Sequence, residues 1–110
     1  MKAMAVIDAG FCGFQTTVIA TSDDDRWVTF DINSPCEKIG GLANAIGHLG
    51  PIDAYQEISA AGKSTVLETA RNALKGCCAG CAVPVGVFKC MQVAAGLALP
   101  KEIHIRLSKE

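Results

Sequence analysis

The fold is decided by residues 26–37, which read RWVTFDINSPCE. Apolar residues occupy every second position from Val28 to Ile32, with polar residues between them, which is typical of a strand with one buried face. The next residues combine an N-cap serine, Ser34, with proline at the first helical position and a glutamate, Glu37, that completes a capping box. A strand is therefore expected to pass directly into a helix.

Two further strands are predicted upstream of this junction. Residues 1–7 form a short apolar run, and residues 15–21 are rich in Thr, Val and Ile. The polar turn at residues 22–25 (SDDD) joins the second of these strands to residues 26–32 as a hairpin, and a solvated loop is favoured there over a calcium site. Residues 1–7 then add a third strand.

Downstream, the pattern becomes helical. Apolar residues recur at helical spacing from Ile39 to Leu49, and Gly50 and Pro51 end the run. A short helix is expected after residue 53, a third from the capping box at 65–68 through residue 74, and a last one from residue 84 or 85 to 99. Residues 103–107 alternate again. The class expected is α+β: a three-stranded antiparallel sheet followed by several helices on one face, with room for an extra C-terminal edge strand.

Length and composition indicate one domain spanning residues 1–110. Half of the residues are hydrophobic, 19% are charged, and the net charge is −1, which disfavours disorder and gives no basic stripe for nucleic acid. The apolar N-terminal run is too short for a signal peptide and no stretch could span a bilayer, so we expect a cytoplasmic protein with no membrane partner. Thiols stay reduced in that compartment.

The six cysteines are then more informative than any other residue type, because reduced thiols favour metal binding or thiol chemistry over disulfides. Cys77, Cys78 and Cys81 lie in one loop, where the C-x-x-C spacing lets two sulfurs reach one metal. Cys12 precedes Gly13 between the first two strands, and glycine lets a backbone approach a bulky ligand closely or simply makes a tight turn.

Two more cysteines belong to predicted helices. Cys36 lies in the first turn of the best-capped helix, where the helix dipole favours a thiolate, although a buried structural thiol is the alternative. Cys90 lies in the last predicted helix, about two turns after Pro84, and is expected to point back to the 77–81 loop. The two histidines, His48 and His104, are expected at the surface rather than as ligands.

The order of these parts resembles the iron–sulfur cluster assembly scaffold family of the NifU N-terminal or IscU type, over about residues 10–99. In that family a three-stranded sheet precedes helices, and three cysteines converge at one end; Cys12-Gly13, Cys36 and the segment from Val83 to Cys90 match their order. The sequence departs at Phe14, where the family commonly has an acidic residue, at Lys89, where His is frequent, and in the added 77–81 loop.

The resemblance implies a non-enzymatic iron–sulfur scaffold, carrier or accessory protein. The core metal ligands that it implies are Cys12, Cys36 and Cys90. The added C-x-x-C loop offers Cys81 as the best fourth ligand and Cys78 as the next, and Gly13 and Cys77 are expected beside the cluster. Its partners would be a sulfur donor and apo iron–sulfur proteins, with the oligomeric state left open. Two alternatives remain: a structural zinc domain, and a thiol oxidoreductase or persulfide carrier that uses Cys36, which lacks an evident general base.

Overall fold

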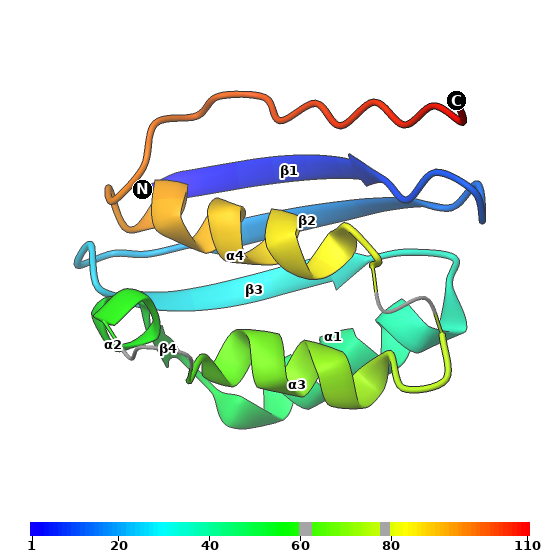
Figure 1. Cartoon of the computed structure of the whole chain (residues 1–110). Coiled ribbons are helices and arrows are strands. Elements are labelled where there is room, and N and C mark those ends of the chain that lie inside the picture. Colours follow the sequence, from blue (N-terminus) through cyan, green and yellow to red (C-terminus); the bar gives the residue numbers. More distant parts are fainter. Residues whose placement is uncertain (60–62, 78–79) are drawn as a thin grey trace.

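The computed structural model describes residues 1–59, 63–77 and 80–110. An antiparallel sheet forms one layer, with strands in the order β1 (Lys2–Asp8), β2 (Gln15–Thr21), β3 (Trp27–Asn33) and the short β4 (Ile52–Asp53) (Figure 1). In its register, Val18 of β2 lies opposite Ala5 of β1 and Ile32 of β3. The three long strands are those predicted, within one residue at each end, whereas β4 was not predicted.

Four helices follow: α1 (Glu37–Leu49), α2 (Ala54–Ser59), α3 (Thr65–Ala73) and α4 (Val83–Ala94). Helix α4 packs on β1 and β2, α1 packs on β3, and α3 contacts both of these helices (Figure 1). The α+β class with helices packed on an antiparallel sheet is therefore confirmed. None of the helices in the described part of the chain combines the length and apolarity needed to cross a bilayer.

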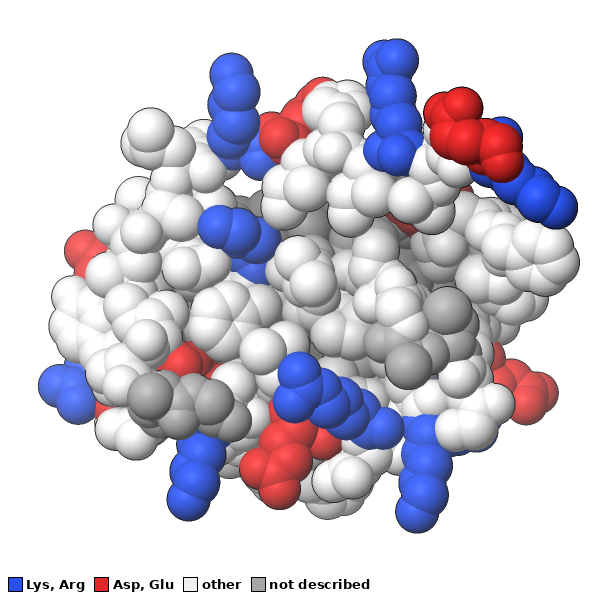
Figure 2. Space-filling view, viewed as in Figure 1, with Lys and Arg blue, Asp and Glu red and all other residues white. Residues whose placement is uncertain are grey.

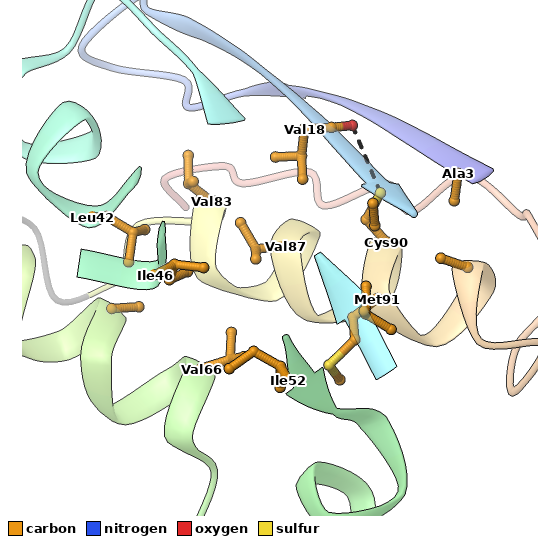
Figure 3. Close-up of a cluster of buried hydrophobic side chains, with 14 of the residues drawn as sticks. Ala3, Val18, Leu42, Ile46, Ile52, Val66, Val83, Val87, Cys90 and Met91 are labelled. Carbon is orange, nitrogen blue, oxygen red and sulfur yellow. Dashed lines mark hydrogen bonds between the residues drawn. The ribbon is translucent and has the colours of Figure 1, made fainter. Parts of the chain in front are cut away.

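The core lies between the sheet and the helices (Figure 3). Alternate strand residues are buried there, because successive side chains of a strand point to opposite faces. The buried side chains include Val18, Val28, Leu42, Val66, Val87 and Met91. The opposite face of the sheet is open, and it exposes Met4, Val6 and Trp27.

One close contact fixes α4 against the sheet. Gly86 faces Ile7 of β1, and a Cβ built on Gly86 would lie 2.3 Å from the Ile7 Cδ1 atom. Only a residue without a side chain lets the helix approach the strand this closely.

Several predicted helix boundaries were wrong. Helix α1 begins at Glu37 with Cys36 as its N-cap, because the Ser34 hydroxyl instead accepts hydrogen bonds from the Thr16 hydroxyl and the Cys36 N–H. Helix α3 is capped by Ser64, one residue before the predicted box. Helix α4 ends at Ala94, five residues before Leu99, because the chain turns at Gly96 with a φ of 74°.

The predicted C-terminal edge strand at residues 103–107 was also wrong. Residues 101–110 are all exposed, and no strand is assigned to them. Alternating side chains make a segment compatible with a strand, but a strand forms only where a neighbour accepts its backbone hydrogen bonds. Figure 1 draws this tail as irregular chain that runs in the same direction as β1.

Candidate functional site

Three connections carry cysteines to one end of the sheet. In an antiparallel sheet, β1 and β3 end on the same side, so the β1–β2 turn and the chain entering α1 lie together there. The connection from α3 to α4 returns to that side (Figure 1). We call this region the cysteine end; its described cysteines are Cys12, Cys36, Cys77 and Cys81.

Hydrogen bonds join these connections. The Thr16 hydroxyl, just after the β1–β2 turn, donates to the Ser34 hydroxyl oxygen at 2.9 Å, and the Cys36 N–H donates to the same oxygen at 3.2 Å. Lys38, in the first turn of α1, donates from Nζ to the Lys75 carbonyl at 2.8 Å. These hydrogen bonds therefore hold together the three connections that carry the cysteines.

Cys12 is exposed at the tip of the β1–β2 turn. Gly10 and Gly13 flank it with φ values of 84° and 74°, and the Gly13 N–H donates to the Gly10 carbonyl at 2.9 Å. Both glycines therefore serve the turn. A Cβ on Gly13 would have no neighbour within 4 Å, so the space around this turn is open to a ligand.

Cys36 is half-buried at the N-cap of α1. Its carbonyl accepts the Gly40 N–H at 2.9 Å, whereas its side chain makes no capping hydrogen bond. The sulfur is therefore placed at a helix N-terminus, where backbone N–H groups favour a negatively charged ligand atom. It also packs against the hydrophobic core, which shields one side of it from water.

The α3–α4 connection contributes Cys77 and Cys81. Cys77 is exposed and its N–H donates to the Leu74 carbonyl at 2.9 Å, in the turn that closes α3. Cys81 is half-buried and packs against the core just before α4. Cys78 was also predicted as a ligand, and it lies outside the described residues.

Cys90 lies apart from the cysteine end. Its side chain is buried in the core beneath β2, and its Sγ donates to the Val18 carbonyl at 3.7 Å (Figure 3). It lies about two helical turns after Val83, the first residue of α4, and so away from Cys81, which precedes the helix. Burial raises the pKa of the Cys90 thiol, which disfavours the thiolate that a metal requires.

The histidines are where the sequence places them, at the surface. His48 is exposed in the last turn of α1, with its Nδ1 2.7 Å from the Asn44 carbonyl, and His104 is exposed beside Glu102. Within residues 1–59, 63–77 and 80–110, no three His, Cys, Asp or Glu side chains are grouped closely enough to hold a metal ion. Cys12, Cys36, Cys77 and Cys81 share one end of the molecule without forming a closed ligand shell.

Glu57 is a buried residue whose role was not predicted from the sequence. Its carboxylate accepts hydrogen bonds from the Ser64 hydroxyl and from the N–H groups of Thr65 and Val66, at 2.7 to 2.8 Å. It thus caps the N-terminus of α3 from α2. A single glutamate eight residues before a helix carries no sequence signal of this role.

The other end of the sheet holds an exposed polar cluster. Arg26 binds the Asp53 carboxylate through two nitrogens, at 3.2 and 2.9 Å, and its hydrogen bond lowers the pKa of Asp53. The guanidinium also lies over the rings of Trp27 and Tyr55, at 6.0 and 5.7 Å from their centroids. This cluster ties the β2–β3 turn to β4 and α2.

A groove of about 670 Å³ runs beside α2, α3 and α4. Its lining combines apolar Leu67 and Phe88 with Glu68 and Arg71, two side chains of opposite charge. On the face drawn in Figure 2, positive and negative side chains of the described residues are likewise interspersed around the rim. Neither feature selects a ligand of one charge.

The fold and these thiols define a small α+β domain with cysteines concentrated at one end. The chain belongs to DUF6951, a family of unknown function, whose model matches residues 3–107. No curated protein and no solved structure matches it. The family description names no chemistry, so the resemblance to iron–sulfur scaffolds stays a prediction.

Proposed function

We propose that the protein binds a soft metal through the cysteine end, as a carrier or accessory protein for an iron–sulfur cluster. Cys12 and Cys36 are the proposed ligands from the first two connections, and the 77–81 loop supplies the remaining thiolates. The observation that carries the proposal is the convergence of three cysteine-bearing connections held together by hydrogen bonds through Ser34 and Lys38. Soft thiolates select iron–sulfur clusters, zinc or copper(I) over hard cations.

The donor types fit such a group, but the described thiols are not gathered in advance. Cys12 is exposed on a turn with open space around it, whereas Cys36 is fixed by α1. Metal binding is therefore expected to draw the β1–β2 turn toward Cys36, and the free energy of binding orders the turn. Amide hydrogen exchange at residues 9–14 should slow when metal is added.

The partners proposed for such an iron–sulfur role are a sulfur donor and apo iron–sulfur proteins. A thiol enzyme finds less support. His48 lies in the last turn of α1, at the opposite end of the helix from Cys36, and the exposed His104 ring pairs with Glu102 in the tail; neither contact offers a general base to a described cysteine.

The test is anaerobic purification of the full chain, followed by measurement of iron, acid-labile sulfide and zinc. Cys12→Ser and Cys36→Ser should each lose most of the metal. Cys90→Ala is the matched control, because it removes a thiol from the core and should leave the metal content unchanged. Zinc without sulfide would instead identify a structural zinc domain. Full metal retention in both serine variants, or its loss in folded Cys90→Ala alone, would refute the proposed ligand set.

A further inference from the structure

Strand β1 is an edge of the sheet, and half of its backbone groups face outward. The Met1 amine donates to the Ser22 carbonyl, and the Ser22 N–H donates to the Met1 carbonyl at 2.9 Å, so these two residues form a hydrogen-bonded pair. Bonded and non-bonded pairs alternate along an antiparallel ladder. Counting from Met1, the N–H and C=O groups of Met4 and Val6 point away from β2.

This edge has few of the features that prevent strands from adding to it. The Met4 and Val6 side chains are apolar and 68% and 56% exposed. Lys2 and Asp8, at its two ends, are its only charged residues. A strand of seven residues with an uncharged middle is a template for another strand.

The C-terminal tail has the pattern of the missing strand. Ile103, Ile105 and Leu107 alternate with His104 and Arg106, and the three apolar side chains are 53%, 71% and 91% exposed. Among the described residues, the hydrogen bonds of residues 101–110 join the tail only to nearby residues of its own segment or to Leu99. The family model nevertheless extends to residue 107, so this segment belongs to the shared sequence.

We propose that two copies of this chain exchange their tails, each tail pairing with the β1 edge of the other copy. The direction of the tail favours a second copy over its own β1. Figure 1 shows that the tail runs in the same direction as β1, so pairing within one chain would be parallel. A two-fold axis perpendicular to the sheet reverses the second copy, and its tail then runs antiparallel to β1.

The symmetric arrangement satisfies both edges at once. The strand order across the interface is β1, the partner's tail, the first copy's tail and the partner's β1, and every neighbouring pair is antiparallel. Each copy presents the same surface to the other, as a two-fold interface requires. The exchange provides hydrogen-bond partners for Met4 and Val6 and removes the exposed edge.

The experiment is sedimentation velocity on the full chain over a dilution series, in reducing agent so that Cys12 cannot link copies by a disulfide. We expect about 23 kDa, twice the 11.5 kDa of one chain. Ile105→Pro removes a backbone donor from the middle of the tail and should give the monomer mass. Ser108→Pro, beyond the alternating segment, is the matched control and should stay dimeric.

Amide hydrogen exchange at Met4 and Val6 distinguishes the alternatives. In the unmodified chain these amides should exchange slowly, and in Ile105→Pro they should exchange rapidly. A monomer with slow exchange would show that the tail pairs with its own β1, and a monomer with rapid exchange would show an unpaired edge. Either result, or a dimer that survives Ile105→Pro, would overturn the exchange. Metal content has no part in this test, so it is independent of the proposed function.

Discussion

Gly86→Ala tests whether the close approach of α4 to β1 is as tight as the structure shows. The added Cβ would lie 2.3 Å from Cδ1 and 2.6 Å from Cγ1 of Ile7. Ile7 is only 8% exposed, so its side chain has little room to move. Overpacking a core typically costs about 1–3 kcal/mol, and replacing glycine by alanine within a helix returns about 1 kcal/mol. Because two atoms clash, we expect a net loss of about 1–2 kcal/mol.

Ile7→Val is combined with Gly86→Ala in a double-mutant cycle, because it removes the Ile7 Cδ1 atom, which lies closest to the added Cβ. Alone, it should cost about 0.5–1.5 kcal/mol through lost packing. In the Gly86→Ala background it should cost less or restore stability, since it relieves the clash. The coupling between the two changes isolates the contact from their separate effects.

The measurement is the free energy of unfolding from urea titrations followed by circular dichroism, with the m-value compared between variants. Gly41→Ala is the matched control. Gly41 lies within α1 and its added Cβ meets nothing within 4 Å, so this variant should be more stable by about 0.5–1 kcal/mol. If Gly86→Ala stabilised the protein as much as Gly41→Ala does, the reasoning on the α4–β1 contact would be refuted.

The remaining predictions concern Glu57 and Cys90. Glu57→Ala leaves three donors at the start of α3 without their carboxylate and should cost about 2–4 kcal/mol in urea unfolding; a loss below about 0.5 kcal/mol would contradict its role as a cap. Cys90 should alkylate more slowly than the exposed Cys12 in metal-free folded protein, and mass spectrometry that found equal rates would count against its burial. Because burial raises the pKa of Cys90 in the folded state, its contribution to stability is complete below the ordinary thiol value of 9.0 and falls as pH rises above it; Cys90→Ala should flatten that decline, measured as unfolding free energy against pH.

The strands and most helices could be predicted because local pattern and tertiary packing agree in them. The alternation from Val28 to Ile32 places one face of β3 in the core, and the spacing from Ile39 to Ile46 does the same for α1. The helix boundaries were less predictable, because a capping side chain can be engaged by a partner that is distant in the sequence. Ser34 is diverted from capping α1 by Thr16, which is 18 residues away in sequence.

The C-terminal tail shows why an alternating pattern alone does not predict a strand. Residues 103–107 alternate like β3, yet they form no strand in a single chain. A strand forms only beside a sheet edge with free backbone groups, and the relative direction of the two strands matters. The sequence of the segment itself determines neither of these. A second copy would supply an edge in the antiparallel direction.

The position of one cysteine follows from local sequence pattern, and the positions of the others follow from the topology. Cys90 follows Val83 and Val87 at helical spacing, so the sequence pattern indicates that it lies on the buried face of α4. Cysteine is also among the residues most often buried. Cys12, Cys36 and Cys81 belong to no such stripe. They stand in connections, and only the antiparallel order of β1, β2 and β3 brings those connections to one end. The core accounts for the position of Cys90, whereas the topology accounts for the position of Cys12, Cys36 and Cys81 at one end of the sheet. Under the proposed metal binding, the ligands are therefore expected among these connections, and the contrast in metal content between Cys36→Ser and Cys90→Ala is the sharpest test of that proposal.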